Sequence, residues 1–294
     1  MRKNRSQKSE VRSQKQEKNL SLASCLLPLI LLFTVHCSLL TVVTGCSDDP
    51  VRPLYEKAEE NFSNMAYLKA IDNYNEIVNG YPESSYAPAS QYKIGLINSL
   101  YLKDYRKAMN AYTTLILLYP RSKEVMLAKQ DMAEIYIKRD DYRKAIGEYQ
   151  WLVKNTIGPE RDDFQYQIAM TYLKLTDIKQ ARIELQEVVK SSPNSQIAPQ
   201  VYYQIANTYY LEGDYSGAIN AYERLISLYP SDPYATEARL WKAICIEETG
   251  NLDEAMELYT ELEKSYPNPD VIRVRMDAIE ERENKNTPVA LKEN

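Results

Sequence analysis

Residues 202–222 read YYQIANTYYLEGDYSGAINAY, and this stretch decides the fold. Ala206 and Ala218 stand twelve residues apart, on either side of Gly213 and Asp214. Small side chains let two helices approach closely. A glycine suits the left-handed end of a helix, and an aspartate can cap the start of the next one. The stretch therefore predicts a helical hairpin, two helices joined by a short turn.

The same pattern occurs six times along the chain. One series of alanines has gaps of 38, 37, 36, 37 and 37 residues: Ala70, Ala108, Ala145, Ala181, Ala218 and Ala255. A second series of small residues lies upstream at nearly the same period: Ala58, Gly95, Ala133, Ala169, Ala206 and Ala243. A tyrosine or leucine follows each member of the first series by four residues: Tyr74, Tyr112, Tyr149, Leu185, Tyr222 and Tyr259. This fixed period indicates an array of repeats.

Turn chemistry repeats with the same period. A polar residue stands four positions before each later alanine and is expected to cap the second helix: Asp104, Asp141, Asp177, Asp214 and Asn251. Prolines are expected to close most second helices: Pro82, Pro120, Pro193, Pro230 and Pro267. The third repeat differs, because its proline is delayed to Pro159. Asp232 and Pro233 are expected to begin a helix, as its cap and its first-turn proline.

The repeat closely resembles the tetratricopeptide repeat over about 54–267, although its period of about 37 exceeds the usual 34. The resemblance implies an all-α fold, a right-handed superhelical solenoid with a concave and a convex side. We expect about six hairpins within 54–270, a capping helix at 271–283 and a disordered tail at 284–294. The hairpins are expected at about 54–82, 88–120, 125–159, 162–193, 199–230 and 236–267.

The first residues predict export. Positions 1–19 hold seven basic and two acidic residues, and an uncharged apolar run follows from about Leu20 to Val43. Residues 43–46, Val-Thr-Gly-Cys, then resemble the lipobox of a bacterial lipoprotein signal. The resemblance implies that 1–45 is a cleaved signal peptide and that Cys46 carries acyl chains such as palmitate. Residues 46–53 then form a short polar linker.

The sequence offers two alternatives to this anchor. A second lipobox-like string ends at Cys25, but no apolar segment precedes it. The apolar run is also long enough for an uncleaved transmembrane anchor, since a bilayer needs about 20 residues. In the lipoprotein family Ser47 favours the outer membrane, which implies attachment to its periplasmic face. The linker reaches at most about 20–25 Å, so it would hold the solenoid at the membrane surface.

Composition excludes several classes of function. The formal net charge is −5, and it becomes more negative once the basic leader is removed, which argues against a nucleic-acid partner. The single histidine, His36, lies in the leader, so a histidine-dependent hydrolase or zinc site is excluded. Seven later glycines form no phosphate-cradling cluster. We therefore expect no enzyme activity, no cofactor, no metal and no small-molecule substrate.

A few remaining residues invite a chemical interpretation. Acidic pairs occur along the chain, among them those at 140–141, 162–163 and 247–248. The first is expected at a turn and Glu247-Glu248 on a helix surface, where neighbouring carboxylates do not converge on one substrate atom. Cys245 lies among apolar residues and is expected to be a small core residue.

The remaining candidate site is a groove on the concave side. The resemblance implies that the first helix of each hairpin lines it. In the fifth repeat Tyr203, Asn207 and Tyr210 form a stripe separate from the residues that face the partner helix. Alignment of the repeats adds corresponding residues in the earlier hairpins: Tyr92, Gln130, Glu134, Tyr166 and Met170. The alternative is that the tyrosines pack against neighbouring hairpins, and the sequence leaves both possibilities open.

Resemblance to three families suggests partners among envelope proteins. Residues 53–59 (PLYEKAE) and 81–87 (YPESSYA) resemble the lipoprotein subunit of the outer-membrane β-barrel assembly machinery. Repeats five and six also resemble the periplasmic repeat protein associated with the Tol–Pal system and cell division. A pilotin-like lipoprotein that escorts a secretin is the third possibility. The first implies a role in assembling outer-membrane proteins, and the sequence does not name the client.

Overall fold

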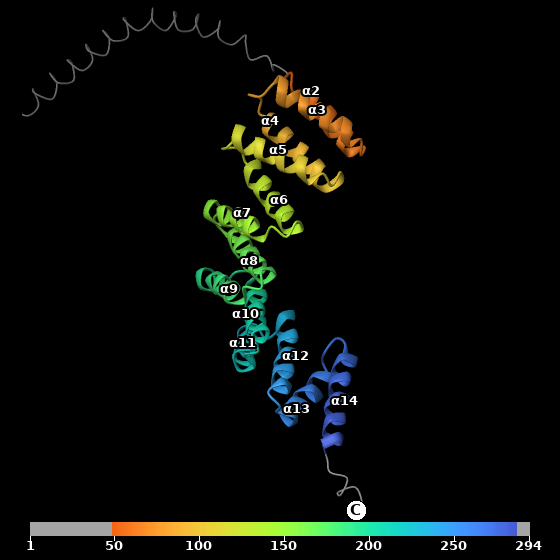
Figure 1. The fold of residues 1–294 in the computed structure, drawn as a ribbon, viewed down its shortest axis with the longest axis vertical. Coiled ribbons are helices and arrows are strands. Elements are labelled where there is room, and N and C mark those ends of the chain that lie inside the picture. The colour runs from red at the N-terminus through yellow and green to blue at the C-terminus, as the bar shows by residue number, and fades with distance from the viewer. Residues whose placement is uncertain (1–48, 287–294) are drawn as a thin grey trace, which may run out of the picture.

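The computed structural model describes residues 49–286, which form thirteen α-helices and one π-helical segment, with no β-strand in that range (Figure 1). The helices pair into six hairpins, and a single helix, α14, follows them. Figure 1 shows the hairpins stacked one after another along the long axis. Within 49–286 no helix combines the length and the apolar character needed to cross a membrane.

The hairpins have the following bounds. The first three are α2 (Arg52–Ser63) with α3 (Tyr67–Gly80), α4 (Ala87–Leu96) and η1 (Ile97–Tyr101) with α5 (Tyr105–Leu118), and α6 (Glu124–Lys138) with α7 (Tyr142–Asn155). The last three are α8 (Pro159–Lys174) with α9 (Ile178–Ser191), α10 (Ala198–Leu211) with α11 (Tyr215–Leu228), and α12 (Pro233–Glu248) with α13 (Leu252–Glu263). Helix α14 spans Pro269–Asn286. The described part of the chain is thus an all-α repeat solenoid.

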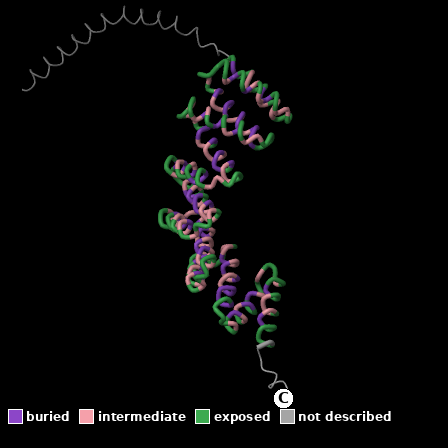
Figure 2. Tube along the Cα trace, in the orientation of Figure 1, coloured by how far each residue is buried: buried purple, intermediate pink, exposed green. Residues whose placement is uncertain are grey.

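The two series of small residues lie where the helices meet. Every alanine of both series is fully buried, and Gly95 is buried with them. The tyrosines four residues after the alanines are the largest fully buried side chains: Tyr74, Tyr112, Tyr222 and Tyr259. In Figure 2 the buried residues follow the inner faces of the helices, with exposed residues outside. The two series of small residues therefore mark the helix–helix contacts, as the sequence predicted.

The second hairpin contains one residue more than the others, and the π-helix η1 absorbs it. Asp104 follows Gly95 by nine residues, whereas Asp214 follows Ala206 by eight. The N–H of Leu102 donates to the carbonyl of Ile97, five residues back, at 3.0 Å. A single wider turn of this kind accommodates an inserted residue without breaking the helix. In the sequence, this extra residue accounts for the 38-residue gap between Ala70 and Ala108.

Three of the five predicted caps are formed as expected. The carboxylates of Asp104, Asp177 and Asp214 accept hydrogen bonds of 3.0, 3.1 and 2.9 Å from the backbone N–H three residues on. Asp232 likewise accepts from the N–H of Tyr234, and Pro233 opens α12.

The other two caps were predicted wrongly. Asp141 and Asn251 occupy the same helix-start position, but neither side chain bonds to the helix backbone. Asn251 donates instead to the carboxylate of Glu254 at 2.6 Å, and Asp141 lies 3.4 Å from the ammonium of Lys144. At these two turns the side chain at the helix start contacts the side chain three residues on and makes no bond to the helix backbone.

Some element boundaries differ from expectation. Pro159 begins α8 and does not close the third hairpin, because α7 ends at Asn155 and the chain is extended at Thr156. Helix α14 is longer at both ends than the predicted 271–283, so residues 284–286 are helical. The predicted signal peptide and lipidated Cys46 lie outside the described residues, as does the tail beyond 286.

The sequence analysis placed Glu247 on a helix surface, and this prediction was wrong. Glu247 is only 3% exposed. Its carboxylate accepts a hydrogen bond from the hydroxyl of Tyr259 at 2.8 Å and pairs with Arg275 and Arg282 of α14 at 3.3 and 3.1 Å. Helix α14 covers this face of α12, which the repeat pattern alone leaves open. Cys245 is fully buried as expected, and burial raises the pKa of its thiol to about 12.

Candidate partner-binding surfaces

The eight predicted groove residues all lie on first helices of their hairpins, on α4, α6, α8 and α10. Glu134 is exposed and the other seven are half-buried. Because each helix contributes at most three of them, they form a discontinuous band along the solenoid. Their contacts decide how much of each side chain a partner could reach.

In the fifth hairpin the stripe joins α10 to its neighbours. The ring of Tyr203 lies 6.0 Å from that of Tyr222 and 5.5 Å from that of Tyr234 on α12, measured between centroids. Tyr210 meets Trp241 of α12 edge-on at 5.1 Å. Burial, and then the charge of Glu237, raise the pKa of the Tyr203 phenol to about 12. One side of each ring is therefore used to hold the fifth hairpin against the sixth.

The earlier tyrosines of the stripe also have partners within the solenoid. The ring of Tyr92 lies 5.9 Å from that of Tyr112. The hydroxyl of Tyr166 accepts a hydrogen bond from the amide of Gln200, 3.0 Å away on α10, and burial raises the pKa of that phenol. These contacts fit the packing alternative, while the half-exposed remainder of each ring stays available to a partner.

Asn207 belongs to a structural motif that the sequence analysis missed. Its Oδ1 accepts a hydrogen bond of 2.5 Å from the buried hydroxyl of Tyr222. In the first hairpin Glu59 holds the same position, directly after the small residue, and accepts from the hydroxyl of Tyr74. Glu134 also holds it, and its charge, after burial, raises the pKa of Tyr149 to about 12.

The fourth hairpin lacks both members of this motif. Met170 follows Ala169 there, and Leu185 replaces the tyrosine. A polar residue next to the small one, paired with a tyrosine fifteen residues later, was the available signal in the sequence. Two predicted groove residues, Glu134 and Asn207, thus interact with a tyrosine on the second helix of their own hairpin.

A hollow of about 360 Å³ lies between the first helices α6 and α8. It is lined by Gln130, Glu134, Ile137, Lys138, Tyr149, Asp163, Phe164, Gln167 and Lys174. Two predicted groove residues, Gln130 and Glu134, therefore come together here. Burial, and then the charge of Asp131, raise the pKa of Glu134, and burial with Asp162 does the same for Asp163. The hollow thus carries charges of both signs beside the apolar surfaces of Ile137, Tyr149 and Phe164.

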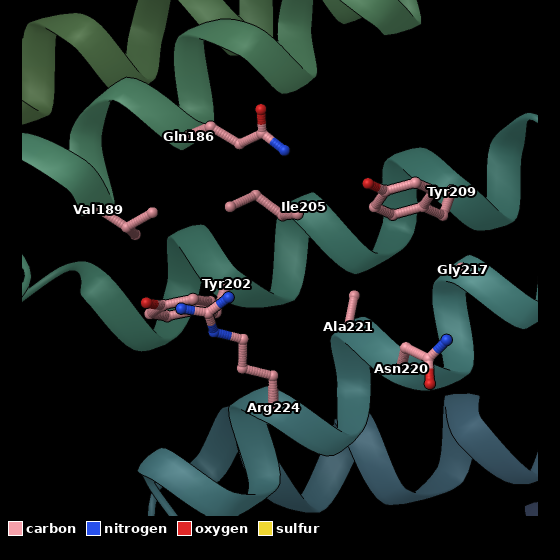
Figure 3. A pocket seen from close by; sticks show the side chains of 9 residues that line it. All are labelled: Gln186, Val189, Tyr202, Ile205, Tyr209, Gly217, Asn220, Ala221 and Arg224. Atoms are coloured by element: carbon pink, nitrogen blue, oxygen red, sulfur yellow. The ribbon is translucent and has the colours of Figure 1, made fainter.

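A second hollow, of about 350 Å³, lies between α9, α10 and α11 (Figure 3). Its walls are Gln186, Val189, Tyr202, Ile205, Tyr209, Gly217, Asn220, Ala221 and Arg224. Figure 3 shows Arg224 beside Tyr202 at one end and Tyr209 toward the other. The guanidinium of Arg224 lies 5.6 Å from the centroid of the Tyr202 ring, and that of Arg182 lies 3.7 Å above Tyr209.

The sequence analysis did not predict this second hollow, which the three helices α9, α10 and α11 form together. Tyr202 and Tyr209 stand seven residues apart and so share one face of α10, a spacing that could have revealed the surface. Two second helices, α9 and α11, form its walls, so it opens away from the predicted groove. In the part of the chain that the structure covers, no cluster of three or more histidine, cysteine or carboxylate side chains could hold a metal ion.

Comparison with protein families agrees with this architecture. Models described as tetratricopeptide repeat match residues 163–195 and 203–268. The model described as an outer membrane lipoprotein matches residues 47–129, which include the first two hairpins. The chain is thus a tetratricopeptide-repeat scaffold of the kind that binds proteins. Its N-terminal part is similar to outer membrane lipoproteins. No curated protein matches the chain.

Solved structures show the same fold. A tetratricopeptide repeat protein from Parabacteroides merdae is 16% identical, with 78% of this chain and 86% of that chain covered and a TM-score of 0.52. The C-terminal part of a repeat protein from Cytophaga hutchinsonii is 19% identical over 71% and 78%, with a TM-score of 0.55.

Proposed function

We propose that this protein is a lipid-anchored scaffold of the bacterial envelope that takes part in assembling β-barrel proteins at the periplasmic face of the outer membrane. The observation that carries the proposal is the match of residues 47–129 to outer membrane lipoproteins. That match begins one residue after Cys46, where the lipobox-like sequence ends. The scaffold itself performs no chemistry in this proposal.

The surfaces support a role in binding protein segments. The hollow between α6 and α8 and the one between α9, α10 and α11 open on different sides of the solenoid. Both combine aromatic rings with amide and charged groups, and aromatic and arginine side chains dominate the energetics of protein interfaces. A stack of hairpins gives such sites a rigid frame, since each hairpin contacts its neighbours.

The tether supports a partner close to the membrane. From Cys46 to Arg52, the first residue of α2, the chain can extend by about 20 Å at most. An acylated Cys46 would therefore keep the first hairpins at the bilayer surface. Two or more acyl chains hold a protein firmly, whereas one chain holds it only marginally.

Crosslinking in the native envelope tests the proposal. A photoreactive residue at Gln130 probes the hollow on the first helices, and one at Asn220 probes the hollow on the second helices. Under the proposal, at least one position crosslinks to the assembly barrel or its accessory subunits, and depletion of the protein lowers outer-membrane porins. Normal porin levels after complete depletion would refute this role.

A second candidate role rests on the later hairpins. Residues 163–195 and 203–268 match general tetratricopeptide models and lie outside the lipoprotein match. This favours a client other than the barrel machinery, such as a Tol–Pal component or an escorted secretin. Depletion would then leave porins normal, and would cause cell chaining in the first case or a mislocalised secretin in the second.

A further inference from the structure

The turns of the first two hairpins expose five large apolar side chains. Met65 and Leu68, between α2 and α3, are 74% and 68% exposed. Leu100 and Tyr101, at the end of η1, and Leu102, directly after it, are 42%, 44% and 37% exposed. We call these five residues the turn edge. Scattered single apolar residues are normal on a surface, but five on two adjacent turns require an explanation.

Three aromatic rings join the two turns into one surface. The ring of Tyr101 stacks on that of Tyr67 at 4.4 Å and meets Phe62 edge-on at 5.5 Å. In Figure 1 the α2–α3 turn and the start of α5 lie at the same side of the solenoid. The residues of the turn edge therefore flank a continuous aromatic strip.

The local backbone is built to present these side chains. The residue inserted in the second hairpin lies within the η1 turn, which carries Leu100 and Tyr101. Met65 has a left-handed backbone with φ of 59°, as Lys103, Asp140 and Thr176 have in the next three hairpins, whereas the fifth and sixth use Gly213 and Gly250. A non-glycine residue in that conformation costs about 1 kcal/mol.

Positive charge surrounds the turn edge. Lys69, Lys103, Arg106 and Lys107 are all exposed on the same two turns. Asp104 lies among them and pairs with Lys107 at 3.5 Å. The next turn, between α6 and α7, carries Asp140 and Asp141, the latter 3.4 Å from Lys144, and exposes four basic residues: Lys138, Arg139, Arg143 and Lys144. The corresponding turns of the fifth and sixth hairpins instead expose Glu212, Asp214, Glu248, Asp253 and Glu254. A chain with a net charge of −5 thus concentrates basic residues at its N-terminal turns.

We propose that the turn edge rests on an anionic lipid bilayer. Tyrosine and aliphatic side chains with lysine and arginine around them match the chemistry of a membrane–water interface. Each basic residue near an anionic surface raises partitioning by about fivefold. The turn edge would thus fix the orientation of the solenoid, with its acidic C-terminal hairpins directed away from the lipid.

The length of the tether agrees with this placement, and here the inference rests on the proposed membrane anchor. Helix α2 has 12 residues and is about 18 Å long, so Val51 and Met65 lie at opposite ends of it. The five residues from Cys46 to Val51 can extend by about 17 Å. Because Asp49 to Arg52 already form a turn, the extendable part of the tether is shorter than this, so the anchor and the turn edge touch the same bilayer surface when α2 lies along it and not across it.

Site-specific quenching tests the inference on the full chain in vesicles of phosphatidylethanolamine and phosphatidylglycerol. Leu68→Cys carries an environment-sensitive fluorophore at the turn edge, and Leu211→Cys carries it on the fifth hairpin as the matched exposed control. Cys245 is fully buried, and labelled wild-type protein gives the background. Lipids that carry a quencher near the headgroup are expected to quench the label at 68 several-fold more than the label at 211.

Neutralising basic residues beside the turn edge distinguishes its contact with the lipid from the contact made by the acylated Cys46. Lys69→Gln, Lys103→Gln and Arg106→Gln together should strongly reduce quenching at 68, while flotation with the vesicles continues through the anchor. Flotation with equal quenching at both labels would overturn the inference and leave the anchor intact. A label at 68 that responds to an added acidic peptide and not to lipid would overturn it in favour of a protein partner. Failure to float would refute the anchor, and the inference with it.

Discussion

Gly95 of α4 packs directly against the ring of Tyr112 on α5. A Cβ atom at position 95 would lie 2.6 Å from Cδ1 of that ring, well inside contact distance. The second hairpin therefore has its closest helix approach at the one member of the small-residue series that has no side chain.

Replacing Gly95 with alanine is expected to destabilise the solenoid by about 1–3 kcal/mol, because the rigid ring of Tyr112 cannot move aside without disturbing the core. Urea titration followed by circular dichroism measures the change. Gly147→Ala is the matched control, since nothing lies within 4 Å of a Cβ there. It should stabilise α7 slightly, by up to about 1 kcal/mol. Equal effects of the two changes would contradict the packing argument.

Tyr222 and Asn207 should be energetically coupled through their hydrogen bond. Tyr222→Phe leaves the Oδ1 of Asn207 without its donor, and Asn207→Met leaves the buried hydroxyl without its acceptor. Each single change should cost about 1–3 kcal/mol. The double variant, which resembles the apolar pair of the fourth hairpin, should cost less than the sum of the two. A double-mutant cycle that shows strict additivity would rule out the coupling.

Glu247 is expected to hold the capping helix. Glu247→Ala removes the buried partner of Tyr259, Arg275 and Arg282, and should cost about 3 kcal/mol or more. Hydrogen exchange should rise in α14 before the other helices. The neighbouring Glu248→Ala is the control, because that side chain is exposed, and it should change stability by less than about 0.5 kcal/mol. Unchanged exchange in α14 would refute this role.

Asp131 should make stability depend on pH. Burial raises the pKa of its carboxyl above the ordinary 3.8, although the hydroxyls of Tyr112 and Tyr92 oppose the shift. A raised pKa means that its contribution to stability is complete below 3.8 and is lost as pH rises through the folded-state value. Asp131→Asn removes that loss while keeping an acceptor for Tyr112.

The free energy of unfolding of Asp131→Asn, relative to that of the unchanged protein, should therefore increase between pH 3.8 and neutrality. Urea titrations across that range measure it. Asp72→Asn, at an exposed carboxylate, is the control. A constant difference between Asp131→Asn and the unchanged protein would show that the carboxyl titrates alike in the folded and unfolded chains.

Cys46→Ala should block acylation and cleavage of the signal. Mass spectrometry of the N-terminus of the envelope-derived protein is expected to show an acylated Cys46 in the unchanged chain and an uncleaved leader in the variant. An unmodified Cys46 would contradict the anchor. Each buried methylene of an acyl chain contributes about 0.8 kcal/mol, so loss of the chains should release any cleaved protein from the membrane.

Most of the fold could be predicted from the repeat period of the sequence. The alanine and glycine series marked the helix contacts, and the tyrosines four residues later proved to be the core. The predicted caps formed at Asp104, Asp177 and Asp214. They failed at Asn251, where a side chain three residues on offers a competing partner. Such competition depends on rotamers that a repeat pattern does not specify.

The sequence alone determined that the chain is a stack of helical hairpins, because burying one apolar face per helix requires a fixed period of small and aromatic residues. Only the tertiary structure decided which faces remained available to partners. Glu247 became buried because α14 docks over it, and Tyr203 and Tyr210 turned toward α12. Tyr202 and Arg224 came to line a hollow. These outcomes depend on how adjacent hairpins are rotated against each other, and that rotation is set by packing between segments distant in the sequence.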